Sequence, residues 1–192
     1  MKVSWITVKI FFDTEFTGLY KDTELISIGL VDENGREFYG EITDFDKSKV
    51  DGWIRENVLL NTIEFGDVSI LDICDVVDNY YVGTKETITN YLKEWLKAYD
   101  NVELVSDVCH YDMVLFIDLF GTAFDLPSNI NASCHDINQD IASYLDITEQ
   151  EAFDYSREIF INIFGVNNIE SNKHNSLYDA KIIKQIYSII NS

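Results

Sequence analysis

The stretch "TVKIFFD", residues 7–13, carries apolar side chains on both faces of a strand, and this feature constrains the fold most. A half-exposed strand would alternate apolar and polar residues, so this run predicts a central strand that is covered on both sides. The runs "ELISIGLVD" and "REFYGEI" are also β-prone, and the Asn34-Gly35 pair between them is typical of a hairpin. We therefore expect three antiparallel strands in meander order at the start of the chain.

The rest of the chain reads as helices around one further strand. Apolar periodicity and capping residues predict helices within residues 46–60, 84–99, 111–121, 135–145, 148–165 and 176–190, and a strand over residues 101–106. Residues 61–82 give no clear pattern. This order of elements indicates an α/β fold with a mixed central sheet flanked by helices.

Composition limits the class of protein. A chain of 192 residues with 46% hydrophobic residues is expected to form a single domain over residues 1–192 rather than a disordered chain. We see no membrane span and no signal peptide, and read Cys74, Cys109 and Cys134 as reduced thiols, so a cytoplasmic protein is expected. A zinc site built on Cys134 and His135 is a weaker alternative.

The charge is strongly and unevenly negative. The formal net charge is −20, and residues 56–84 and 98–156 contain no Lys or Arg. A protein that coats long nucleic acids carries a basic patch, so this distribution argues against that class. It leaves room for a site in which metal ions supply the positive charge.

Asp13 and Glu15 stand two positions apart at the end of the first strand. Their side chains share one face, roughly 6.6 Å apart along a strand that rises about 3.3 Å per residue. Two carboxylates this close repel each other, and a divalent cation such as Mg²⁺ would remove the repulsion. For an isolated pair, a solvated strand end is the commoner explanation.

Two later segments add acids that face the core. In "CHYDMVLF", Asp112 shares a helix face with Leu115 and Phe116, although Asp107 at the end of the preceding strand competes for the same role. In "HNSLYDAKII", Asp179 lies on the apolar face of the last helix and His174 precedes it. A capping box formed by Ser176 and Asp179 is the local alternative.

Together these residues favour a metal-dependent site. Four acids and one histidine come from a central strand and two helices, and a pair of metal ions about 3.5–4 Å apart needs such a cluster. A histidine can take the proton from an attacking water.

The motifs "DTEF", "HYD" and "HNSLYDA", in this order, resemble those of the DEDDh 3′–5′ exonucleases, which have the ribonuclease H-like fold. The run "TELISIGLVDENGREFYGEI" is similar to that of the small mycobacterial-type exoribonuclease subfamily. The resemblance covers roughly the first 45 residues, residues 84–121 and the last 20, whereas residues 47–82 and 122–173 match poorly and are expected to be specific to this protein. It implies three antiparallel strands followed by parallel ones.

The resemblance also implies a role for each residue. Asp13 would bridge two Mg²⁺ or Mn²⁺ ions, Glu15 and Asp179 would hold the ion that activates water, and Asp112 would support the second ion. His174 would be the general base. The terminal nucleotide would lie against four residues: Phe16, Thr17, Gly18 and Leu19.

The expected function is therefore a metal-dependent 3′–5′ exonuclease that releases nucleoside 5′-monophosphates, with RNA favoured over DNA by the subfamily resemblance. The only basic residues near the third motif are Lys173, Lys181 and Lys184, so we expect a distributive enzyme acting on short single-stranded ends or oligonucleotides. Relatives are often homodimers, but no segment identifies an interface. The alternatives are an inactive module of the same fold that binds a nucleotide or protein partner, and an acidic cation-binding protein.

Overall fold

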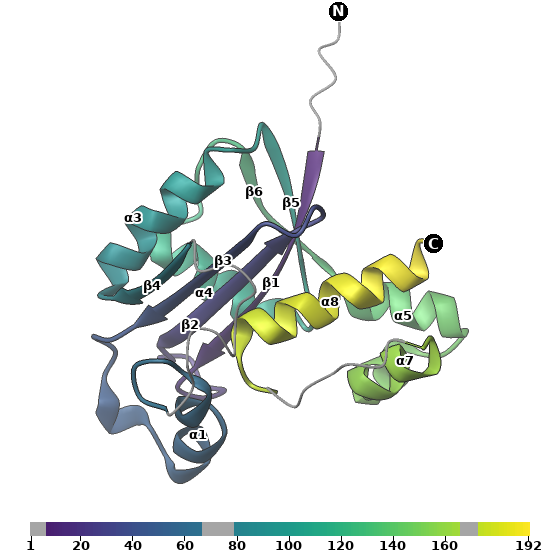
Figure 1. The fold of residues 1–192 in the computed structure, drawn as a ribbon, viewed down its shortest axis with the longest axis horizontal. Helices are drawn as coiled ribbons and strands as arrows, with labels where there is room; N and C mark the ends of the chain where they lie inside the picture. The colour runs from purple at the N-terminus through teal and green to yellow at the C-terminus, as the bar shows by residue number, and fades with distance from the viewer. Residues whose placement is uncertain (1–6, 67–78, 166–172) are drawn as a thin grey trace, which may run out of the picture.

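The computed structural model describes residues 7–66, 79–165 and 173–192, which form one six-stranded sheet with helices on both faces (Figure 1). The strands are β1 Thr7–Phe16, β2 Leu25–Asp32, β3 Glu37–Ile42, β4 Tyr80–Gly83, β5 Asn101–Ser106 and β6 Ile130–Asp136.

The strand order across the sheet is β4-β3-β2-β1-β5-β6, so β1 is central as its sequence predicts. β1, β2 and β3 form an antiparallel meander, whereas β4, β5 and β6 each pair in parallel with their neighbour. The turn between β2 and β3 uses Gly35 at φ +92°, a conformation that glycine adopts without strain. The predicted mixed sheet, antiparallel first and parallel afterwards, is confirmed.

The helical segments follow the predicted order. They are η1 Lys47–Lys49, α1 Gly52–Asn57, η2 Leu59–Asn61, α3 Lys85–Leu96, α4 His110–Phe120, α5 Ile137–Leu145, α6 Glu149–Asp154, α7 Arg157–Ile163 and α8 Ser176–Ile190. Thr84 caps α3 by accepting from the backbone N–H of Thr87, and Gly121 follows the end of α4 at φ +108°, as the sequence indicates. None of the helices in the described ranges is both long and apolar enough to cross a membrane.

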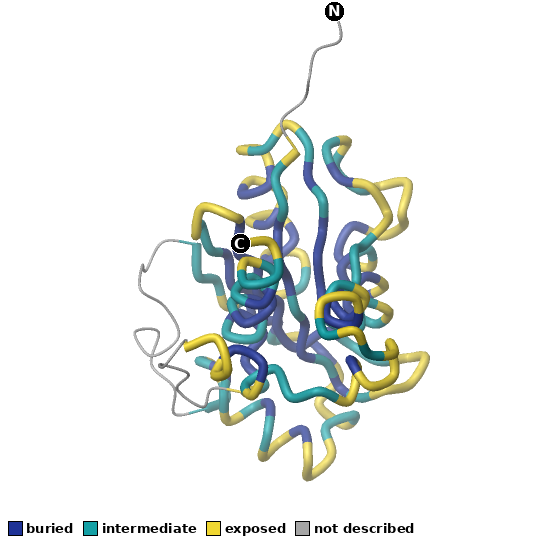
Figure 2. Tube along the Cα trace, turned by 90° about the vertical axis from the view of Figure 1, so that its right-hand side faces the viewer, coloured by how far each residue is buried: buried dark blue, intermediate teal, exposed yellow. Residues whose placement is uncertain are grey.

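The helices form two layers, one on each face of the sheet. Phe12 packs into a core with residues of α3 and α4, and its neighbour Phe11 packs on the other face with residues of α5, α7 and α8. Both rings are at most 1% exposed, and buried backbone runs through the middle of the sheet in Figure 2. The covered central strand is thus a consequence of its doubly apolar sequence.

Three features differ from the expectations. β6 lies where no strand was predicted, and β4 falls in the segment 61–82 that gave no pattern. Both are edge strands, and most of β6 is exposed or half-buried, so it lacks an apolar signature. The predicted helix over residues 148–165 is two helices, because Tyr155 is extended and Ser156 caps a new helix by accepting from the backbone N–H of Ile159.

The start of α8 lies directly on β2 at Gly29. A Cβ atom at this position would come within 2.2 Å of the backbone nitrogen of Leu177. Gly29 also pairs with Asp13 across the sheet, so the absence of a side chain here lets α8 approach the strand that carries the first motif.

Candidate active site

The motif residues meet at one end of the sheet, where the parallel strands β1 and β5 terminate. Asp13 and Glu15 stand near the end of β1, and a register shift follows Glu15. α4 and α8, which carry Asp112 and Asp179, both begin at this end of the sheet. The carboxyl ends of parallel strands are the usual place for ligand sites in such sheets.

Asp13, Glu15 and Asp179 form a compact acidic group. Each offers a carboxylate oxygen, and these atoms lie within 4.8 Å of one another; no other such group of three occurs in the part of the chain that is described. Burial and the neighbouring carboxylates raise the pKa of Asp13 and of Glu15 well above their ordinary values, and burial raises the pKa of Asp179 to about 7. The three groups therefore resist carrying full negative charge together.

Asp112 stands just outside this group and is held by two hydroxyls. Its side chain is 5% exposed, and its two oxygens accept from the hydroxyls of Thr14, at 2.5 Å, and Ser106, at 2.9 Å. Burial raises the pKa of Asp112 to about 6, and the two hydroxyl donors oppose that rise. The first and second motifs are thus joined through Thr14.

Asp107, the alternative to Asp112 as a metal ligand, is hydrogen-bonded to Arg157 and Asn138. The guanidinium of Arg157 donates to both of its oxygens, and Nδ2 of Asn138 donates to one of them at 2.8 Å. A carboxylate that already accepts three charged or amide N–H bonds has little remaining capacity for a cation.

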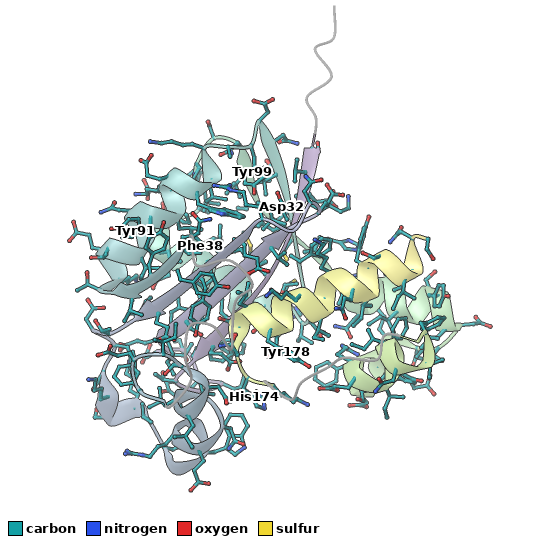
Figure 3. The ribbon with its side chains drawn as sticks, viewed as in Figure 1. Asp32, Phe38, Tyr91, Tyr99, His174 and Tyr178 are labelled. Carbon is teal, nitrogen blue, oxygen red and sulfur yellow. The ribbon has the colours of Figure 1, made fainter. Side chains whose placement is uncertain are left out.

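His174 lies in the loop that enters α8, labelled in Figure 3. It adopts φ +65°, and its backbone N–H donates to the Asp179 carboxylate at 3.0 Å, which ties the two motif residues together. Burial, followed by the charge of Lys173, lowers the pKa of the imidazole. The neutral ring that a proton acceptor requires is therefore the favoured form.

The capping box of Ser176 and Asp179, the local alternative for this motif, does not form. The cap of α8 is Asn175, whose side chain accepts from the backbone N–H of Tyr178, whereas the Ser176 hydroxyl shares a hydrogen bond with Ser27. Among the described hydrogen bonds, the Asp179 carboxylate accepts one, from the backbone N–H of His174, and Asp179 also contributes an oxygen to the acidic group.

This donor set fits hard divalent cations. Carboxylate oxygens are the ligands that Mg²⁺ and Mn²⁺ prefer, and a bound cation would stabilise the charged carboxylates that burial, and for Asp13 and Glu15 also their acidic neighbours, disfavour. Neither Cys134 nor His135 belongs to the group; His135 instead pairs with Asp140 at 2.7 Å. Cys109 and Cys134 are free thiols, and Cys74 lies outside the described residues.

A cavity of about 820 Å³ opens on one side of the acidic group. Residues 16–19, predicted to contact a terminal nucleotide, are among the residues that line it: Leu19 is 77% exposed, and Phe16 stacks on Tyr111 with ring centroids 5.4 Å apart. Thr17 is only 2% exposed, and its hydroxyl accepts from the backbone N–H of Glu24, so this side chain holds the loop in shape. Gly18 adopts φ +147° in the same loop.

A second cavity of about 470 Å³ opens on the other side and also reaches Asp13 and Asp179. Lys173 lines it and lies 3.7 Å from Glu158, with 62% of its side chain exposed. Lys181 pairs with Glu37 at 2.9 Å. Of the three lysines noted in the sequence, only Lys173 borders a described cavity beside the acidic group.

Sequence reasoning gave no role to three residues that border these cavities: Trp53, Tyr111 and Arg157. Tyr111 precedes Asp112 within the quoted "HYD" motif, so its position was a usable signal. Trp53 and Arg157 come from segments without a motif, and their contacts depend on the folded chain.

Comparison with known proteins finds relatives of this chain. The sequence is 30% identical over 134 residues to the 3′-5′ exoribonuclease Rv2179c of Mycobacterium tuberculosis strain H37Rv, covering 69% of this chain and 73% of that protein. The same values hold for the 3′-5′ exoribonuclease MT2234.1 of strain CDC 1551.

Solved structures of 3′-exonucleases share the fold. The nuclease domain of 3′hExo, a DEDDh family member bound to rAMP, superposes with a TM-score of 0.68 at 12% identity, over 100% of this chain and 94% of that one. A 3′-exonuclease that recognises the 3′ end of a histone mRNA stem-loop gives 0.65 at 13% identity; the match covers 95% of this chain but only 63% of that one. Residues 8–191 match the 3′-5′ exoribonuclease Rv2179c-like domain, and the chain belongs to this family.

Proposed function

We propose that this protein is a 3′–5′ exoribonuclease that uses two divalent metal ions and a histidine base to release nucleoside 5′-monophosphates. The observation that carries the proposal is the group formed by Asp13, Glu15 and Asp179, whose oxygens lie within 4.8 Å of one another beside His174. A fold that binds no cation would gain nothing from keeping mutually repelling, poorly solvated carboxylates together, and the neighbouring histidine favours catalysis over cation binding alone.

Four carboxylates would hold the ions, with Asp13 between them, Glu15 and Asp179 on the side of the attacking water, and Asp112 on the other side. Bound Mg²⁺ or Mn²⁺ would supply the positive charge that makes water easier to deprotonate and offsets the charge on the phosphate. Asp112 is preferred to Asp107 because Arg157 and Asn138 already engage Asp107.

His174 would accept the proton of the attacking water. Its lowered pKa keeps the imidazole neutral near pH 7, and its link to Asp179 places it at the rim of the acidic group. Residues 16–19 would contact the terminal nucleotide in the larger cavity. The exposed Leu19 and the stacked Phe16–Tyr111 pair offer apolar contact to any base, which is worth about 1–3 kcal/mol per stacked base.

RNA is the favoured substrate because the family and its mycobacterial members are named exoribonucleases. The described lining of the cavities includes the cations Lys49, Arg157 and Lys173, and the first two are paired with Glu24 and Asp107. This sparse positive charge supports a distributive enzyme that contacts few phosphates, so short single-stranded ends or oligonucleotides are the proposed substrates. A homodimer stays a prediction, which light scattering on purified protein would test.

The direct test is to incubate end-labelled single-stranded RNA, the matching DNA and a dinucleotide with the protein and Mn²⁺ or Mg²⁺. We expect stepwise shortening from the 3′ end, faster on RNA, and complete dependence on the cation. Asp13→Ala should abolish turnover, and His174→Ala should lower it by about 10²–10⁴-fold.

Two outcomes would contradict the proposal. A wild-type protein without activity on all three substrates would favour the inactive binding module. Activity retained in Asp13→Ala would overturn the site assignment while leaving the family unchanged.

A further inference from the structure

The loop that carries His174 is held on both sides by one residue of the connection between β3 and β4. Nδ2 of Asn61 donates to the backbone carbonyl of Lys173 at 3.0 Å. The backbone carbonyl of Asn61 accepts from Nδ2 of Asn175, also at 3.0 Å. Asn175 is 2% exposed, so its amide N–H groups need partners, and Nδ2 also donates to the hydroxyl of Tyr39 at 3.4 Å. Residue 61 is therefore bonded to the backbone just before His174 and to the side chain just after it.

The His174 ring contacts the same connection. Trp53 meets it edge to face, with ring centroids 5.1 Å apart and an angle of 76° between the planes. Within the described ranges, neither ring nitrogen of His174 has a hydrogen-bond partner, and Trp53 is the one aromatic ring that contacts it. Among the described residues, Trp53 is therefore the contact that can orient the imidazole, and none of them bonds to either ring nitrogen.

The helix that carries Trp53 is firmly attached to the fold. Asp51 caps α1 by accepting from the backbone N–H of Ile54 at 2.8 Å, and the buried Ile54 and Val58 pack against Ile26. Trp53 itself is 53% exposed and lines the larger cavity, so its side chain adds little to the core of this helix. α1 thus holds the ring of Trp53 at the site, and the packing of α1 on the fold does not depend on that ring.

From these contacts we propose that Trp53 and Asn61 position His174 for catalysis: Trp53 orients the imidazole, and Asn61 holds the backbone carbonyl of Lys173 just before it. The inference rests on the proposed role of His174 as the base. In most enzymes a hydrogen-bonding group orients the catalytic histidine. Here an aromatic contact does so, and Trp53 and Asn61 are positioning residues that act through His174.

The first test compares Trp53→Ala, Trp53→Phe and the control Glu56→Ala, an exposed position on the same helix, on a short single-stranded RNA with Mn²⁺. A misplaced base lowers the rate of the chemical step, so Trp53→Ala should lower kcat by roughly 10- to 100-fold with KM changed less than about twofold. Trp53→Phe keeps an aromatic contact and should recover most of kcat. Unchanged kcat in Trp53→Ala would overturn the proposal.

The second test is a double-mutant cycle with His174→Ala. If Trp53 acts through His174, Trp53→Ala should cause no further loss in the His174→Ala background, and Asn61→Ala should behave in the same way. An equal loss in both backgrounds, or a rise in KM in both, would mean that Trp53 contacts the substrate independently and would overturn the proposal. Thermal unfolding of each variant checks that the fold is retained.

The two proposals fail in different ways. An inactive wild type, or a His174→Ala variant as active as the wild type, would contradict the proposed function. An active wild type that loses activity in His174→Ala but shows no coupling to Trp53 would contradict only the positioning role.

Discussion

Arg157 binds Asp107 through two parallel hydrogen bonds, from Nε at 2.6 Å and from Nη2 at 2.8 Å. Its remaining N–H groups donate to the side chain of Asn138 and to the backbone carbonyls of Ala152 and Tyr155. One side chain thus joins the end of β5 to the helices α5, α6 and α7. It also keeps the charge of Asp107 engaged beside the acidic group.

Arg157→Ala should destabilise the protein by roughly 2–3 kcal/mol, because it leaves a partly buried carboxylate and two carbonyls without their partner. Adding Asp107→Asn should recover part of the loss, since the uncompensated charge is then removed. Urea unfolding of the single and double variants measures both effects. Lys97→Ala, which breaks an exposed ion pair with Glu94, is the control and should cost less than about 1 kcal/mol. An equal loss in Lys97→Ala would contradict the interpretation.

Asp13→Asn should affect stability and activity in opposite directions. In metal-free protein the substitution removes a poorly solvated charge that repels Asp112 and Asp179, so the free energy of unfolding should rise by about 1–2 kcal/mol. The stabilisation that Mn²⁺ gives the wild type, and the activity, should both disappear. Thermal unfolding with EDTA and with Mn²⁺ measures this, and the exposed Asp100→Asn controls for the change in net charge. A destabilised metal-free Asp13→Asn would contradict the repulsion argument.

The metal-free protein should become less stable as the pH rises from about 4 to about 7. Asp112 and Asp179 titrate at about 6 and about 7 in the folded state, against an ordinary pKa of 3.8, so between those values the folded state binds more protons than the unfolded state. His174 and four more exposed carboxylates have lowered pKa values and act in the opposite direction: Glu24, Asp46, Glu151 and Glu158. The buried acids of the site have the larger shifts and should set the sign. Melting temperatures across this range with EDTA test the slope.

Saturating Mn²⁺ should flatten or reverse that dependence, because cations replace protons in the acidic group. Calorimetric titration should accordingly give tighter Mn²⁺ binding at pH 8 than at pH 6. A pH dependence that is the same with and without the cation would argue against metal binding at these carboxylates.

Gly29→Ala should separate α8 from the sheet. The new Cβ atom would clash with backbone atoms of Ser176 and Leu177, which cannot move without displacing the helix that carries Asp179. We expect a loss of roughly 3 kcal/mol or more, together with loss of Mn²⁺ binding. Gly52→Ala is the matched control, since nothing lies within 4 Å of its Cβ position, and it should be nearly neutral. A stable Gly29→Ala variant that still binds Mn²⁺ would contradict the close-packing argument.

The parts of the fold that sequence predicts are those with a strong local signal. Apolar residues on both faces predict β1, the Thr84 cap predicts the start of α3, and a glycine predicts the end of α4. β6 and the break at Tyr155 carry no such signal, because an edge strand need not be apolar and a cap residue occurs in many loops. Their positions are decided by what packs around them.

The candidate site likewise contains residues that the sequence reveals and contacts that it does not. Asp13, Asp112 and Asp179 were found because acids on apolar faces are unusual in sequence. The contacts of Trp53 with His174, and of Arg157 with Asp107, join residues far apart in the chain and have no periodicity to reveal them. Sequence also left the choice between Asp107 and Asp112 open, and their different hydrogen-bond partners now favour Asp112.

The acidic group joins Asp13, on the first described strand, to Asp179, on the last described helix. During synthesis on the ribosome, β1 is made long before α8, so Asp13 and Glu15 initially lack Asp179, which completes the group. The acidic group is therefore complete only after α8 has emerged. The proposed nuclease activity would accordingly arise only when nearly the whole chain has been translated.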